Sequence, residues 1–284
     1  MSDPIAAITE ADATGEIADI YGDIRRIYRV SVVNLVWRHL ATFPGALPWA
    51  WTTIRPFYLD GTIRREAAGM LAALPLPELP KMPRDVWEAA GLNEPDRTQI
   101  RTVLAAYDRS NSMALVAFTT LQVRLAPDLF PPTASPDAVP VIPSEPDAEL
   151  HLPPLLSLKD MPDATARLVL TLNRFGAGAV ADPVLASMYR TLAAWPAFLT
   201  LTWALLAPVN ASGALDRTIT ETRAIARMRA RRIAAIIPPS SPLLPAALRP
   251  DILKALDRFA GDAIARMVAI CAMLHRSVGA EAEV

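Results

Sequence analysis

The 284-residue chain has one cysteine, three histidines and eleven glycines, and its charges nearly cancel. The single cysteine, Cys271, excludes an internal disulfide framework and fits a reducing compartment. With 28 basic and 29 acidic residues, the chain has no global field to attract nucleic acid or an anionic membrane. The first ten residues lack the basic-then-apolar order of a secretory signal, so we expect a cytoplasmic location.

Metal and nucleophile motifs are also missing from the sequence. His39, His151 and His275 are isolated, without the His-x-x-x-His or Cys-x-x-Cys spacing of a metal site, so no metal is expected. Neither a Gly-x-Ser-x-Gly elbow nor a Ser-x-x-Lys pair occurs, which leaves nucleophilic serine chemistry without a local signature. The segment from Gly176 to Ala181 fits a dinucleotide fingerprint by letters, but it follows a helical pattern instead of a strand and is predicted to be a loop.

Apolar residues make up 52% of the chain, which favours a folded protein with a large core. Ala, Leu and Arg dominate while alternating strand patterns are scarce, so the predicted class is all-α. The stretch from Thr191 to Leu215 carries no charge and is long enough to span a bilayer. Because Pro196 and Pro208 interrupt it, we interpret it as a core helix and expect no membrane partner.

The strongest pattern is an internal repeat at an offset of 152 residues. The segment 40–56 recurs at 192–208, with the matched pairs Leu40/Leu192, Ala41/Ala193, Phe43/Trp195, Pro44/Pro196, Leu47/Leu199, Trp51/Trp203 and Pro56/Pro208. The same offset pairs Leu104 with Leu256 and Tyr107 with Phe259. We therefore predict two homologous helical repeats forming a pseudodimer, with a cleft between them.

Proline marks the boundary between the predicted repeats. Nine of the 27 prolines fall between residues 124 and 160, and proline favours extended chain over helix. The predicted organisation is an N-terminal repeat at 1–125, a Pro-rich linker at 126–160 and a C-terminal repeat at 161–284.

A polar island at residues 107–112 separates two apolar helical patterns, predicted as helices at 94–107 and 111–125. Asn111 fits an ordinary N-cap of the second helix. A functional role is the competing interpretation, because the offset places Ala263 opposite Asn111 and the other repeat lacks the amide.

Three segments together resemble the group I 2-haloacid dehalogenases: Leu-Ala-Thr-Phe-Pro-Gly at 40–45, the island ending at Asn111, and Ser187 ahead of Leu-Ala-x-Trp-Pro at 192–196. The resemblance covers nearly the whole chain. It implies an all-helical pseudodimer whose site lies between the repeats. It also implies hydrolysis of a 2-haloalkanoic acid by direct attack of an activated water, with inversion and without a cofactor.

The resemblance also assigns residues. The family Asn, which holds the water, matches Asn111, and the family Ser beside the base matches Ser187. The general base, an Asp in the family, falls on Met188, and a thioether cannot accept a proton at neutral pH. Two aromatic pocket residues fall on Val32 and Leu35, which flank a polar Asn34.

Asp108 is the candidate for a replacement base, because it would share a face with Asn111 if the helix began early; the alternative is a surface aspartate. The leading hypothesis is a dehalogenase-like hydrolase that binds a small organic acid. The alternatives are a noncatalytic or altered relative, in which Met188, Val32 and Leu35 line an apolar pocket, and an interaction scaffold whose cleft is packed solid. Whether the chain is an enzyme, and whether it forms a homodimer, both stay open.

Overall fold

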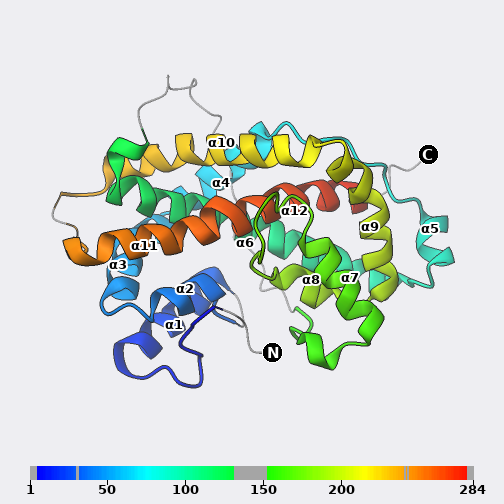
Figure 1. Cartoon of the computed structure of the whole chain (residues 1–284), viewed down its shortest axis with the longest axis horizontal. Coiled ribbons are helices and arrows are strands. Elements are labelled where there is room, and N and C mark those ends of the chain that lie inside the picture. The colour runs from blue at the N-terminus through cyan, green and yellow to red at the C-terminus, as the bar shows by residue number, and fades with distance from the viewer. Residues whose placement is uncertain (1–4, 30–31, 131–151, 240, 242, 280–284) are drawn as a thin grey trace. The chain divides into compact units, whose positions relative to one another are not determined.

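The computed structural model describes residues 5–29, 32–130, 152–239, 241 and 243–279, and every regular element in these residues is helical (Figure 1). The predicted all-α class is confirmed. The α-helices are α1 Gly15–Tyr28, α2 Leu35–Leu40, α3 Ala46–Leu59, α4 Thr62–Ala73, α5 Arg84–Ala89, α6 Glu94–Leu125, α7 Asp163–Asn173, α8 Ser187–Leu192, α9 Pro196–Ala211, α10 Ala214–Ile236, α11 Arg249–Leu256 and α12 Ala265–Val278.

The bounds of several helices follow the 152-residue offset. Helix α8 begins and ends 152 positions after α2, α10 begins 152 positions after α4, and α9 ends 152 positions after α3. The counterpart of α6 is α11, the π-helical segment η4 (Asp257–Ile264) and α12 taken together. This agreement supports the interpretation as a duplication, which remains a prediction, as do the boundaries of the two repeats.

The chain divides into two compact units that do not coincide with the sequence halves. Each unit takes segments from both halves, because α6 and α10 each contribute to both units and so does the stretch from α11 to α12. The first unit is Met1–Ala73, Ser112–Leu150 and Ala224–Gly261, and the second is Leu74–Asn111, His151–Arg223 and Asp262–Val284.

The predicted break between helices at residues 107–112 is wrong. Helix α6 runs without interruption for 32 residues through Asp108 and Asn111, so Asn111 is not an N-cap. The island contains no Gly or Pro, and Asp, Ser and Asn each cost only about 0.7 kcal/mol or less in a helix. That cost is too small to stop a helix whose side chains find partners elsewhere.

Other sequence expectations have mixed outcomes. The segment from Gly176 to Ala181 is confirmed as part of the loop between α7 and α8, where Gly176 and Gly178 have positive φ. Of the predicted linker, residues 131–151 lie outside the described residues, and two short 3-10 turns, Pro127–Leu129 and Leu158–Asp160, flank that stretch.

Within the described ranges, no single helix has the length and hydropathy needed to cross a membrane. One bent pair, Pro196–Ala211 with Ala214–Ile236, meets the criteria of length and composition, with a bend of 84°.

In the first unit, an aromatic core and a polar link hold α1, α2 and α3. The Trp37 side chain is fully buried, with its ring centroid 5.5 Å from that of Trp51 and 4.6 Å from that of Phe118. At the edge of this core, Asp23 of α1 accepts hydrogen bonds from Trp51 Nε1 at 2.8 Å and from Arg55 Nε at 2.5 Å. The Arg55 guanidinium beside Asp23 lowers the pKa of that carboxyl to about 2.

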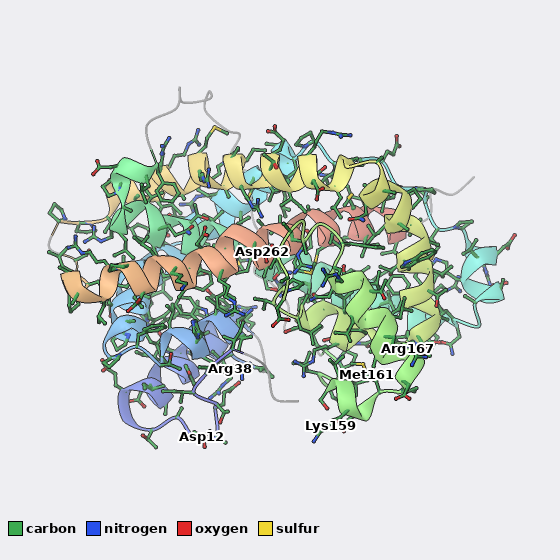
Figure 2. All side chains as sticks on the ribbon, in the orientation of Figure 1. Asp12, Arg38, Lys159, Met161, Arg167 and Asp262 are labelled. Atoms are coloured by element: carbon green, nitrogen blue, oxygen red, sulfur yellow. The ribbon has the colours of Figure 1, made fainter. Side chains whose placement is uncertain are left out.

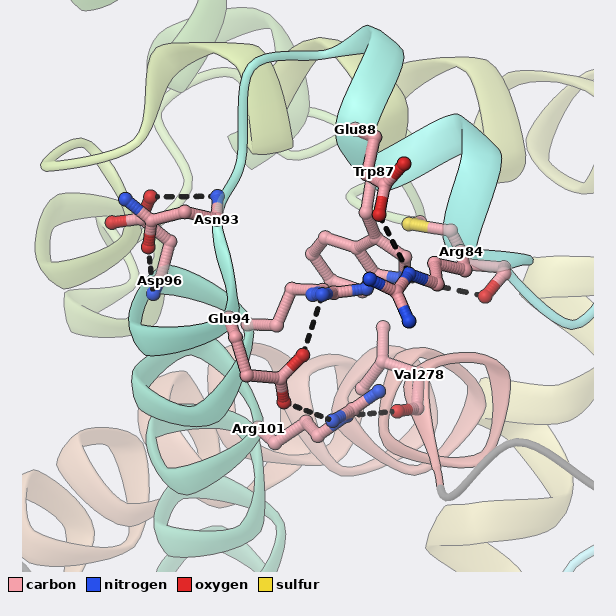
Figure 3. Close-up of polar contacts among 10 residues, drawn as sticks. Arg84, Trp87, Glu88, Asn93, Glu94, Asp96, Arg101 and Val278 are labelled. Carbon is pink, nitrogen blue, oxygen red and sulfur yellow. Dashed lines mark hydrogen bonds and ion pairs between the residues drawn. The ribbon is translucent and has the colours of Figure 1, made fainter.

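In the second unit, the start of α6 is tied to the end of α12 (Figure 3). Asn93 and Asp96 cap α6 reciprocally, with Asn93 N donating to Asp96 Oδ2 at 3.0 Å and Asp96 N donating to Asn93 Oδ1 at 2.9 Å. Arg101 Nε then donates to the Val278 carbonyl at 2.8 Å. The capping bonds define where α6 begins, and the bond from Arg101 to Val278 joins α6 to the last residue of α12.

Candidate functional site

Helix α6 presents Asp108 and Asn111 on one face. They are three residues apart in an unbroken helix, so their side chains are neighbours. The expectation that Asp108 shares a face with Asn111 is therefore met, and the face is directed toward α12 and α8 within the same unit.

Two contacts join this face of α6 to α12. Asn111 Nδ2 donates to Cys271 Sγ at 3.5 Å, and Asp108 Oδ2 lies 3.2 Å from His275 Nδ1. Cys271 and His275 are four residues apart on α12, one helical turn. The contacts of Arg101 with Val278, Asp108 with His275 and Asn111 with Cys271 follow one another along the two antiparallel helices.

The position that the resemblance assigns to the general base is packed by sulfur. Met188, the second residue of α8, is 1% exposed, and the Cys271 thiol donates to its Sδ at 3.2 Å. Asn111, Cys271 and Met188 thus form a chain of contacts across α6, α12 and α8. Cys271 therefore lies between Asn111 and the start of α8, and the Met188 thioether that it contacts there cannot accept a proton.

Cys271 is a packing thiol. Burial raises the pKa of this thiol, the negative charge of Asp108 raises it further, and the hydrogen bond from Asn111 only partly opposes the two effects. A protonated thiol is a poor nucleophile, since thiolate is the reactive form. The groups here that can exchange a proton are instead Asp108 and His275, which are in contact with each other.

Tyr107 supports the cluster from the same helix. Its hydroxyl lies 2.9 Å from Thr191 Oγ1 on α8, and Thr191 in turn donates to the Ser187 carbonyl at 3.2 Å. Burial raises the pKa of Tyr107 to about 12, so it stays a neutral phenol. Ser187 itself is half-buried at the first position of α8.

The loop that leads into α8 is held by two side chains that sequence reasoning missed. Asn173 Oδ1 accepts from Ala186 N at 3.0 Å. The fully buried Arg266 donates to the carbonyls of Asn173 and Val184. Figure 2 labels Asp262, which lies in η4 shortly before Arg266. An isolated arginine in the apolar run from Ala263 to Leu274 is the sequence signal that could have found this anchor.

Val32, Asn34 and Leu35 belong to the first unit. Val32 is 49% exposed, Asn34 precedes α2 without a side-chain capping bond, and Leu35 is the half-buried first residue of that helix. They cluster at the start of α2 within their own unit. Their place in one pocket with Asn111 and Met188 stays a prediction.

No group of three or more His, Cys, Asp or Glu side chains among the residues that the structure describes is arranged to hold a metal ion.

Comparisons with known proteins place this geometry in a family, although no family model matches the sequence. A configuration-inverting 2-haloacid dehalogenase of Alcaligenes xylosoxydans xylosoxydans is 30% identical over 224 residues, which span 71% of this chain and 68% of the relative. An (R)-2-haloacid dehalogenase of Pseudomonas putida is 27% identical over 111 residues, 37% of each chain.

Solved structures agree on the fold. A mutant of D-2-haloacid dehalogenase and a complex of that enzyme with L-LA each match with a TM-score of 0.69 at 18% identity, covering 98% of this chain and 97% of theirs. A mutant complex with D-2-CPA matches with a TM-score of 0.63 at 17% identity, covering 96% of this chain and 95% of its own. On the extent of the sequence match and the shared all-helical fold, the chain belongs to the group I 2-haloacid dehalogenase family.

Proposed function

We propose that the chain hydrolyses the carbon–halogen bond of a small 2-haloalkanoic acid to give a 2-hydroxy acid and halide, without a cofactor. The observation that carries the proposal is the position of Asn111, which meets the start of α8 through Cys271. An amide has two N–H donors, and Cys271 engages one of them, which leaves the other to hold a water. Direct attack by that water inverts the carbon centre, as the name of the Alcaligenes relative describes for that enzyme.

The proposal requires a base other than the residue at position 188. Water is too weak a nucleophile to displace halide without losing a proton in the transition state. Asp108 is the carboxylate on the face of α6 that carries Asn111, and its side chain is 15% exposed. Its Oδ1 is buried and has no hydrogen-bond partner among the described residues, so it keeps unused accepting capacity.

One observation favours the alternative, a relative that binds an organic acid without turning it over. Met188 is in contact with Cys271 at the position where the resemblance expects the family's carboxylate, so sulfur occupies that position. Val32 and Leu35 are smaller aliphatic side chains at positions where the resemblance expects aromatic pocket residues, which would suit a larger ligand. In this case the chain would bind 2-haloacids or related acids and release no halide.

Halide release from D- and L-2-chloropropionate, followed by ion chromatography, tests the proposal. We expect release from at least one enantiomer, with inverted hydroxy acid as product. Asn111→Ala should lower kcat by about 100-fold because it removes the group that orients the water. Ser110→Ala, one position earlier on α6, is the matched control and should retain activity.

The two candidate functions give different results in this assay. An absence of halide release from both enantiomers at high enzyme concentration would contradict the proposed hydrolysis. A rise in Tm with either acid in the same preparation would then support the binding protein.

A further inference from the structure

His275 contacts a carboxylate, as general-base histidines commonly do, although the spacing of the histidines in the sequence does not single it out. Its Nδ1 lies 3.2 Å from Asp108 Oδ2, and its side chain is 41% exposed while that of Asp108 is 15% exposed. The imidazole therefore reaches solvent, and the carboxylate lies beneath it.

This arrangement selects one tautomer of a neutral imidazole. Asp108 accepts a hydrogen bond from the Nδ1–H, which leaves the lone pair on Nε2 free to accept a proton. The same division of roles operates in Ser-His-Asp hydrolases, where the aspartate orients the histidine and stabilises its protonated form without itself taking the proton. Imidazoles as a class titrate closer to neutral pH than carboxylates, which makes them the better general base there.

The alignment of α6 and α12 puts this pair beside the proposed water. His275 is one turn from Cys271 on α12, and Asp108 is nearly one turn from Asn111 on α6, so the two contacts follow one another along the two helices. One helical turn rises about 5.4 Å. Asp108 and Asn111, three residues apart, are separated by about 4.5 Å along α6, and two hydrogen bonds of about 2.8 Å that meet at a near-tetrahedral water join atoms about 4.6 Å apart. The inference therefore requires one water to bridge Asn111 Nδ2 and His275 Nε2.

The geometry points to His275 as the general base of this chain, with Asp108 as its positioning residue, in place of the carboxylate that Met188 replaces. This inference rests on the proposed hydrolysis of 2-haloacids. The water oxygen forms a bond to the halogen-bearing carbon, the electron pair of the carbon–halogen bond leaves with the halide, and one water proton passes to Nε2 of His275. The proton is then released to solvent, so one halide and one proton appear for each hydroxy acid formed.

The first test removes the imidazole. His275→Gln should lower kcat for halide release by about 100-fold or more. The KM should stay within about threefold of wild type, because the imidazole is assigned to the proton transfer and not to substrate binding. His275→Ala supplies a second variant, in which added imidazole should restore at least about tenfold in rate. A purely structural histidine would not show that rescue.

The second test changes the positioning residue. Asp108→Asn removes the charge and can present an amide N–H to Nδ1, which favours the wrong tautomer, so kcat should fall by about tenfold or more. Asp108→Glu keeps the carboxylate and should recover part of that loss. His39→Gln is the matched control, since His39 lies in the first unit with its Nδ1 2.7 Å from the Ala6 carbonyl.

The outcomes separate this inference from the function on which it rests. If wild type releases halide and His275→Gln keeps the wild-type kcat, His275 is not the base and the proposed hydrolysis stands. If wild type releases no halide, both proposals fail. Loss of kcat in folded His275→Gln, together with imidazole rescue of His275→Ala, supports the inference.

Discussion

Trp51 and Trp203 occupy the same place in the sequence repeat, 152 residues apart, yet their surroundings differ. Trp51 on α3 is 3% exposed and donates to Asp23, whereas Trp203 on α9 is 44% exposed. The positions that correspond to Asp23 and Arg55 in the second half are Phe175 and Ala207. Two tryptophans at matching positions of the repeat can therefore differ in burial, because burial depends on the side chains that surround each of them.

The same comparison can be made between the centre of α6 and its counterpart η4. Residues 105–112 are α-helical and carry Asp108 and Asn111, whereas residues 257–264 form a π-helix with Ala260 and Ala263 at the matching positions. One of the two equivalent loci has kept a polar cluster and the other has not. π-Helical segments are rare and frequently mark functional sites, but here the candidate chemical groups lie in the regular helix.

The largest expected difference between the halves is in stability at the two tryptophans. Trp51→Ala should lower the free energy of unfolding by about 3–5 kcal/mol, because it empties a buried site and leaves Asp23 without one donor. Trp203→Ala should cost about 1 kcal/mol, since much of its ring already contacts water. Urea denaturation of both variants measures the difference, and equal losses would show that the two sites are equivalent in solution.

Arg266 offers the next largest effect. The position 152 residues earlier is Ala114, so the first half has no such arginine. Arg266→Ala should lower the free energy of unfolding by about 3 kcal/mol, because two carbonyls lose charged donors in a buried place. The exposed Arg258→Ala is the control and should change stability by less than about 0.5 kcal/mol. An unchanged urea midpoint for Arg266→Ala would contradict its role as the anchor of the loop before α8.

Asp23 should make the first unit sensitive to acid. Its folded-state pKa is lowered from 3.8 to about 2, so its carboxylate contributes stability above pH 4 and loses that contribution as the pH falls through 2. Asp23→Asn should cost about 2 kcal/mol at pH 7, from the lost charged hydrogen bonds. The difference between wild type and variant should shrink toward zero near pH 2, and a difference that is independent of pH would contradict this account.

Local sequence patterns carry much of the fold. The motif pairs at Leu40/Leu192 and Pro44/Pro196 indicate that α2 and α8 occupy matching positions in the sequence repeat. Such patterns can be recognised because proline and apolar spacing act within a few residues. The continuity of α6 could not be read locally. Polar residues at 107–112 are weak helix formers, and their partners come from α12, more than 150 residues later.

The candidate site was only partly predictable for the same reason. Helical spacing places Asp108 next to Asn111, and the family resemblance assigns Ser187 and Met188. The contacts of Cys271 and His275 depend on how α12 is aligned along α6, to which the bond from Arg101 to Val278 contributes. No local pattern encodes that alignment, so a histidine without a motif was overlooked.

Met188→Asp places a carboxylate where the family resemblance expects the base and tests whether the rest of the proposed water site is intact. A carboxylate at position 188, which is linked to Asn111 through Cys271, should raise kcat for halide release by about tenfold, because burial next to Cys271 raises the proton affinity of an aspartate there. The volume-conserving Met188→Leu is the control and should leave kcat near wild type. Stability should fall in the aspartate variant, since position 188 is buried, so circular dichroism must first show that both variants are folded. If folded Met188→Asp is no faster than Met188→Leu, a carboxylate at position 188 is not aligned with a water at Asn111. In that case the proton acceptor must lie elsewhere, as the assignment to His275 with Asp108 requires.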